Sequence, residues 1–269
     1  MDGKLKKGIY IIPSLFTCGN MSCGCLSILA SIGENLSKAA WLIILAIAFD
    51  ALDGRVARIT KTTSEFGVQL DSLSDLVSFG IAPSVMMYQL VLNSIGKVGI
   101  TIAILFVLCS ALRLAKFNVA TKGGAAHSCF MGLPVPASAG LLVSFVLSYG
   151  LFFDVYSGQS LTVKTIPLLM NNMPTVFKFM PAVMVVLSLL EVSNIQYFSF
   201  KKMKLSKPKT FRILVLLVTM ILLVIAFPQN IIFIVFSLYA LSGILGIGAR
   251  YYRLRKKRIN FSNGENDGN

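Results

Sequence analysis

Residues 50–75 read DALDGRVARITKTTSEFGVQLDSLSD and place four aspartates, Asp50, Asp53, Asp71 and Asp75, inside a strongly apolar chain. An acidic side chain at the centre of a bilayer costs about 2.5 to 3.5 kcal/mol on insertion scales. Four such residues so close together therefore need a partner that stabilises their charge. Clustered carboxylates are typical ligands of divalent metal ions, which makes a metal site the first hypothesis for this stretch.

The composition predicts a membrane protein. Hydrophobic residues make up 55% of the 269 residues, charged residues only 13%, and the mean hydropathy is +0.77. So much apolar surface needs lipid to cover it. Apolar segments of membrane-spanning length predict an all-α bundle of about eight transmembrane helices. The expected spans are residues 9–32, 38–57, 67–92, 98–119, 132–153, 174–193, 210–227 and 229–250.

The basic residues orient these spans. With a cytoplasmic amino terminus, all but four of the 25 Lys and Arg residues lie on the cytoplasmic side, the exceptions being Lys38, Lys97, Lys164 and Lys178. Eight spans satisfy the positive-inside rule, seven do not, and both termini are expected in the cytoplasm. The net charge of +14 is then a juxtamembrane belt facing lipid head groups, and it does not indicate nucleic-acid binding.

Histidine and cysteine chemistry is disfavoured. His127 is the single histidine, which argues against a histidine-rich zinc site and a Ser-His-Asp hydrolase. Three of the five cysteines fall in CGNMSCGC, residues 18–25, without a Cys-x-x-Cys pair, and small residues that pack helices are the better interpretation. Catalysis is expected to depend on carboxylates.

Helical spacing predicts that the four aspartates converge. Residues three or four positions apart share one helix face, so Asp50 and Asp53 face one way, as do Asp71 and Asp75. If the two helices pack antiparallel, all four carboxylates can meet in a cleft near the inner membrane surface. Oxygen ligands without Cys or His suit Mg²⁺ or Mn²⁺. Four carboxylates can hold two such ions, and metals about 3.5 to 4 Å apart can clamp a diphosphate.

Small residues accompany the acids. Gly54, Ala57 and Gly67 leave room for a nucleotide or phosphate to approach the helix backbone, although small residues at this spacing also serve helix packing. Arg58 can pair with a phosphate through two parallel hydrogen bonds. Arg55 can do the same, or can extend to the interface as an anchor.

The stretch resembles the signature of the CDP-alcohol phosphatidyltransferase family. Every fixed position matches: Asp, two residues, Asp-Gly, two residues, Ala-Arg, eight residues, Gly, three residues, Asp, three residues, Asp. Further segments resemble the branch of that family that makes phosphatidylserine. They are IPSLFTCGNMSCGCLSI, SEFGVQLDSLSDLVSFGIAPS, ALRLAKFNVA and MGLPVPASAG, between residues 12 and 140, with a thinner likeness in SNIQYFSFKK at 193–202.

The resemblance implies transfer of a phosphatidyl group from CDP-diacylglycerol to the hydroxyl of L-serine, with release of CMP. It implies that the four aspartates bind metal and that Asp75 also acts as the general base. Gly54, Arg58 and Ser64 are the implied contacts to the cytidine diphosphate portion, with Thr17 and Asn20 in a second rank of expected CDP-diacylglycerol ligands. A homodimer is implied as well.

Four further residues are candidates for binding serine. Arg113 and Asn118 lie in a span that is otherwise apolar, and a cation with an amide suits the carboxylate and ammonium of an amino acid. An anchor at the cytoplasmic end and a packing amide are equally compatible with these two. Lys116 and Arg55 complete the set. Glu191 is another acid in a span, expected to pair with a cation of residues 201–212 or to reach water, without a catalytic role.

Three other functions stay open. The acceptor alcohol can be glycerol phosphate or inositol phosphate, because the signature concerns the CDP portion. Membrane prenyltransferases also use aspartate-rich helices, but place their two clusters in separate halves of the chain. A divalent-cation transporter is the third, although its usual paired features are missing from the second half. The expected organisation is a cytoplasmic segment 1–8, a catalytic core 9–150, further transmembrane helices 151–252 and a basic, then disordered, tail 253–269.

Overall fold

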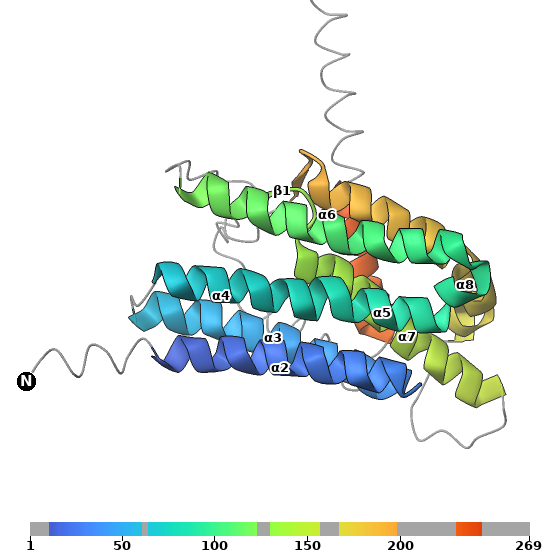
Figure 1. Ribbon diagram of the computed structural model, residues 1–269. Coiled ribbons are helices and arrows are strands. Elements are labelled where there is room, and N and C mark those ends of the chain that lie inside the picture. Colours follow the sequence, from blue (N-terminus) through green and yellow to red (C-terminus); the bar gives the residue numbers. More distant parts are fainter. Residues whose placement is uncertain (1–10, 61–63, 123–129, 157–166, 198–229, 244–269) are drawn as a thin grey trace, which may run out of the picture.

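The computed structural model is a bundle of helices that lie side by side (Figure 1). It describes residues 11–60, 64–122, 130–156, 167–197 and 230–243. The expected all-α membrane architecture is confirmed, and the only strands in these ranges are β1 and β2, of two residues each. The predicted span at 210–227 lies outside the described residues.

The helices follow the predicted spans closely. The long helices are α2 (Ile11–Ile32), α3 (Leu36–Thr60), α6 (Lys97–Lys122), α7 (Val135–Tyr156) and α8 (Pro167–Val192). A further helix covers Asn230–Gly243. α8 begins at Pro167, before the predicted residue 174. Pro174 and Pro181 therefore lie inside the helix, where membrane proteins tolerate proline.

The predicted span 67–92 is a continuous helix in which α-helical and π-helical turns alternate. It consists of α4 (Glu65–Asp75), the π-helical η1 (Leu76–Ile81) and α5 (Ala82–Leu90), and the short 3₁₀ helix η2 (Leu92–Ile95) follows. The π turns begin directly after Asp75. Such insertions are frequent at functional sites, because they alter how the adjoining residues face.

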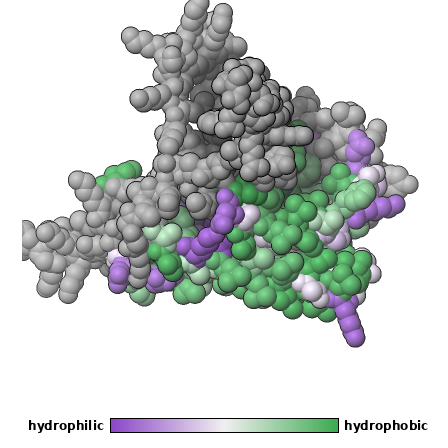
Figure 2. All heavy atoms as spheres, turned by 90° about the horizontal axis from the view of Figure 1, so that it is seen from above, coloured by the Kyte–Doolittle hydropathy of each residue, from purple (hydrophilic) through white to green (hydrophobic). Residues whose placement is uncertain are grey.

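Within the described ranges, three helices are long and apolar enough to cross a membrane by themselves: Ser14–Ile32, Lys97–Ala120 and Pro174–Val192. Shorter apolar helices are Val135–Gly150 and Asn230–Gly243. α3 is not among them because charged residues, among them Lys38, Asp50 and Asp53, interrupt its apolar run, and α4 has only 11 residues. Many large apolar side chains are nevertheless exposed, and examples are Leu15, Leu29, Leu108 and Leu189. Figure 2 shows a broad apolar area on the face that it draws.

Buried serines join the helices where they touch. Ser27 Oγ in α2 donates to the Ala39 carbonyl of α3 at 2.9 Å, and Ser84 Oγ in α5 donates to the Ala103 carbonyl of α6 at 2.8 Å. Small residues allow close helix approach in a membrane, and hydroxyl groups then find partners across the interface. These contacts join α2 to α3 and α5 to α6.

The end of α8 is tied to the start of α7. Strands β1 (Phe130–Met131) and β2 (Gln196–Tyr197) pair in antiparallel fashion. The Gly132 amide donates to the Ile195 carbonyl at 2.8 Å, and the Leu133 amide donates to the Leu190 carbonyl at 3.0 Å. Gly132 has φ +79°, a conformation in which side chains are strained, and a Cβ there would overlap the Glu191 carbonyl oxygen.

Candidate active site at the aspartate cluster

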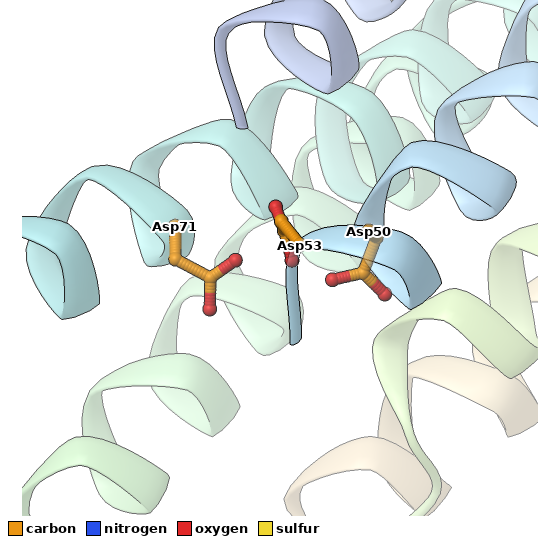
Figure 3. A group of neighbouring side chains, drawn as sticks. All are labelled: Asp50, Asp53 and Asp71. Carbon is orange, nitrogen blue, oxygen red and sulfur yellow. The ribbon is translucent and has the colours of Figure 1, made fainter. Parts of the chain in front are cut away.

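Three aspartates meet between α3 and α4. Asp50 and Asp53 come from the last turns of α3, and Asp71 comes from α4. Each offers a carboxylate oxygen, and these oxygens all lie within 4.8 Å of one another. Figure 3 shows the three carboxylates directed toward a common space. The predicted convergence of two helices is thus present for three of the four acids.

Asp75 stands apart from this group. It lies one turn beyond Asp71, is buried, and its Oδ1 accepts a hydrogen bond from Asn20 Nδ2 at 3.2 Å. Its charge still interacts with those of Asp50, Asp53 and Asp71. The expected four-membered cluster is therefore a group of three with Asp75 beside it, and Asp75 is bonded to α2 instead.

Helix α2 supports the acids through two side chains. Thr17 Oγ1 donates to Asp53 Oδ2 at 3.0 Å, and Asn20 binds Asp75. The backbone of α2 is held in return, since Ser74 Oγ donates to the Thr17 carbonyl at 3.0 Å and Ser78 Oγ donates to the Asn20 carbonyl at 2.9 Å. Thr17 and Asn20 were expected to contact CDP-diacylglycerol, and the structure places them against the aspartates.

The donor set fits a hard divalent cation. Three carboxylates converge, and no sulfur or nitrogen ligand of the described residues joins them, which is the chemistry that Mg²⁺ and Mn²⁺ prefer. Asp71 Oδ1 is buried and has no hydrogen-bond partner among the described residues. A buried carboxylate oxygen without a partner is costly, so it is an acceptor that a cation would satisfy. The cluster could thus hold a metal.

The residues expected to face the nucleotide differ in burial and in their contacts. Ser64 caps α4, since its Oγ accepts a hydrogen bond from the Gly67 amide at 3.0 Å. A Cβ at Gly67 would lie 3.1 Å from that oxygen, so glycine also keeps the cap uncrowded. Gly54 is half-buried and Arg55 is exposed. The side chains of Ala57 and Arg58 lie outside the described part of the chain.

The predicted serine-binding residues separate along α6. Arg113 is buried, with 8% of its surface exposed, whereas Lys116 is exposed and donates from Nζ to Asn194 Oδ1 at 2.6 Å. Asn118 Nδ2 donates to Ser72 Oγ of α4 at 2.8 Å, which links α6 to the residue after Asp71. Only Arg113 lies in the core of the bundle.

Glu191 is buried between helices, which was not expected from the sequence. It is 1% exposed, and its carboxylate accepts hydrogen bonds from Ser110 Oγ at 2.8 Å and from Ser138 Oγ. The expectation that it reaches water is wrong, because α6 and α7 enclose the end of α8; residues 201–212 lie outside the described ranges. An acid in an apolar segment was the available signal, but its serine partners have no signature of their own.

The aspartate geometry coincides with a family match. The model of the CDP-alcohol phosphatidyltransferase family matches residues 10–170, which include the helices that carry all four aspartates. The chain belongs to the CDP-alcohol phosphatidyltransferase family. The signature resemblance found in residues 50–75 is thereby confirmed.

Several similar proteins are named as enzymes that act on serine or make a serine lipid. The chain is 35% identical over 237 residues to the CDP-diacylglycerol–serine O-phosphatidyltransferase of Helicobacter pylori, which covers 88% of this chain and 91% of the relative. It is 36% identical over 138 residues to the enzyme of the same name from Bacillus subtilis, covering 51% and 76%. It is 42% identical over 150 residues to the archaetidylserine synthase of Methanothermobacter thermautotrophicus, covering 55% and 63%.

Proposed function

We propose that this protein is a phosphatidylserine synthase, which transfers the phosphatidyl group of CDP-diacylglycerol to L-serine. The serine hydroxyl oxygen forms a bond to the phosphatidyl phosphorus, the bond to the CMP oxygen breaks, and the hydroxyl proton leaves. The observation that carries the proposal is the convergence of Asp50, Asp53 and Asp71 within the family signature. The near full-length similarity to a relative named for this reaction supports the choice of serine.

We assign the metal site to the aspartates. Asp50, Asp53 and Asp71 would hold two ions, Mg²⁺ or Mn²⁺, with Asp75 as a fourth ligand. When bound, divalent cations neutralise the diphosphate and stabilise the departing CMP. Thr17 restrains one of these carboxylates, since its hydroxyl donates to Asp53. A restrained carboxylate keeps its oxygen aimed at the common space even before a ligand arrives.

We assign proton transfer to Asp75. Its carboxylate is buried beside the cluster and is held by Asn20, so it has a defined orientation and little competing water. A carboxylate in such a position can accept the serine hydroxyl proton as the new bond forms. Both of its roles, base and fourth metal ligand, follow the family resemblance.

The nucleotide and the acceptor take different residues. Gly54, Ala57 and Gly67 would leave space for the cytidine diphosphate. Arg58 would pair with a phosphate, and Ser64 would lie near the nucleotide. Thr17 and Asn20 would support the aspartates. Arg113 is our first choice for the serine carboxylate, because it is a cation in the core of the bundle whose charge interacts with Asp75. Arg55, Lys116 and Asn118 are further candidates for binding the serine acceptor.

The setting follows from the apolar helices. We propose a multi-pass protein of the cell membrane with eight spans, both termini in the cytoplasm and the active site at the cytoplasmic face. In this arrangement the acyl chains of the substrate stay in lipid, while the head group meets the aspartates. We also propose a homodimer, and the domain limits at residues 8, 150 and 252 given above.

A panel of acceptor alcohols tests the function. Purified protein with CDP-diacylglycerol and Mg²⁺ or Mn²⁺ is given L-serine, glycerol 3-phosphate or inositol phosphate, and CMP release is measured. We expect CMP and phosphatidylserine only with L-serine. CMP release with another alcohol instead of serine would move the protein to a different branch of the family. Cation flux into sealed vesicles without CMP release would favour transport.

A further inference from the structure

Three helices share one buried carboxylate away from the metal cluster. Glu191 of α8 accepts hydrogen bonds from Ser110 of α6, at 2.8 Å, and from Ser138 of α7. Ser138 Oγ also lies 2.9 Å from the Val135 carbonyl. A buried acid must be compensated, because desolvation disfavours its charge. Two hydroxyl donors compensate it partly, and a positive charge nearby is the remaining requirement.

Arg113 is a buried cation on the same helix as Ser110. It follows Ser110 by three residues on α6, so the two side chains lie on the same face of the helix. Glu191 and Asp75 lie near enough for their negative charges to favour the positive charge of Arg113. The guanidinium is therefore under the influence of two acids at once: Glu191 in the helix interface, and Asp75 at the proposed site of proton transfer.

One donor of Arg113 is unused. Its Nε is buried and has no hydrogen-bond partner among the described residues, and the residue as a whole is only 8% exposed. An unpaired donor on a buried cation is costly, so this group is available to bind a ligand. A planar guanidinium recognises a carboxylate through two parallel hydrogen bonds. The ligand class that fits is an organic acid.

The backbone around Glu191 is also constrained. The Leu133 amide binds the carbonyl of Leu190, the preceding residue, at 3.0 Å. Gly132 approaches so closely that any Cβ there would overlap the Glu191 carbonyl oxygen. The turn before α7 thus fixes the end of α8, and with it the depth at which the Glu191 side chain enters the bundle.

We infer that Glu191, held by Ser110 and Ser138, is a positioning residue that keeps Arg113 in place to bind the carboxylate of the amino-acid acceptor. This inference rests on the proposed function. It assigns Glu191 a part in specificity: the protein would favour an acceptor that carries a carboxylate over an amino alcohol that lacks one. Glu191 itself touches no substrate.

The test compares L-serine with serinol as acceptors, and the KM for L-serine with the KM for CDP-diacylglycerol. L-Serine and serinol both offer a hydroxyl and an amine, but only serine has the carboxylate. In Glu191→Gln we expect the KM for L-serine to rise by at least about ten-fold, with the KM for CDP-diacylglycerol changed less than about two-fold. The preference for serine over serinol should fall by a similar factor. In Arg113→Lys the same preference should fall, because lysine lacks the planar fork.

Serine variants separate positioning from mere stability. Ser110→Ala and Ser138→Ala keep the carboxylate and should raise the KM for serine in the same direction by a smaller factor. Ser188→Ala is the matched control, since Ser188 is equally buried in α8 but donates only to Met184, within its own helix. It should leave both KM values unchanged.

The outcomes are distinct. An unchanged KM for serine in Glu191→Gln, or an equal rise for both substrates, would overturn the inference while leaving the proposed function standing. If Glu191→Gln does not fold, Ser110→Ala decides by the same criterion. Absence of serine-dependent CMP release by the unmodified protein would overturn both proposals together.

Discussion

Asn20 donates a hydrogen bond from its amide nitrogen to the Asp75 carboxylate at 3.2 Å, across 55 positions of the chain. The bond joins α2 to the last residue of α4, directly before η1. Asn20 Oδ1 is buried and has no partner among the described residues, so this amide is only half satisfied. The pair connects helix packing with the residue proposed to accept a proton.

The Asn20→Ala variant should lower kcat by about ten-fold or more, because the Asp75 carboxylate loses the donor that orients it. The KM for CDP-diacylglycerol should change little if Asn20 acts through Asp75, and it should rise if Asn20 holds the lipid directly. Steady-state CMP release at varied CDP-diacylglycerol distinguishes the two. Ser22→Ala is the control, since Ser22 is exposed and donates only to the Cys18 carbonyl of its own helix.

The Asp75→Asn variant should lose turnover by at least about one hundred-fold, since an amide cannot accept the serine proton. CDP-diacylglycerol binding should persist, because Asp50, Asp53 and Asp71 remain. Single-turnover assays and equilibrium binding in detergent measure the two effects separately. Normal turnover in this variant would remove Asp75 as the base.

The Asp71→Asn variant should weaken Mn²⁺ binding by at least about ten-fold, because one oxygen of the three-carboxylate group becomes a neutral amide. Mn²⁺ titration followed by electron paramagnetic resonance measures the affinity without any substrate. Glu65→Gln is the control, an exposed acid of the same helix outside the group. Equal affinities in the two variants would contradict the metal assignment.

Chelation should abolish activity reversibly. Removing divalent ions leaves three mutually repelling carboxylates at the diphosphate site, so CMP release should stop and return when Mg²⁺ or Mn²⁺ is added back. Far-ultraviolet circular dichroism should stay unchanged, because the helices form by packing and not by metal binding. Full activity after exhaustive chelation would be incompatible with the proposed site.

The Gly24→Ala variant should lower stability by about 1 to 3 kcal/mol, because the added Cβ would lie 2.8 Å from the Ser78 Cα in η1. Backbone atoms cannot yield as a flexible side chain can. Gly19→Ala on the same helix is the control, since its Cβ would meet Phe49 at an ordinary 3.6 Å. Thermal unfolding in detergent should show the difference, and equal midpoints for the two variants would refute it.

Local spacing predicted the parts of the site that one helix face contains. Asp50 and Asp53 are three residues apart, and Asp71 is placed by the same rule on the next helix, so their convergence required only that two consecutive helices pack together. The long apolar segments were predictable for a related reason, since a span needs a fixed length of apolar chain. Ser64 shows the limit: the resemblance implied only a nucleotide contact for it, and the structure adds that it caps α4.

The sequence by itself determined the membrane setting, the family and the cluster of carboxylates, because each depends on composition or on residues within one or two helical turns. Only the tertiary structure decided that Asp75 is bonded to Asn20, and that Glu191 is enclosed by Ser110 and Ser138, 81 and 53 positions away. Those contacts depend on how each helix is rotated against its neighbours. That rotation is set by the close packing of small residues such as Gly24 against Ser78, which leaves no periodic pattern in the sequence.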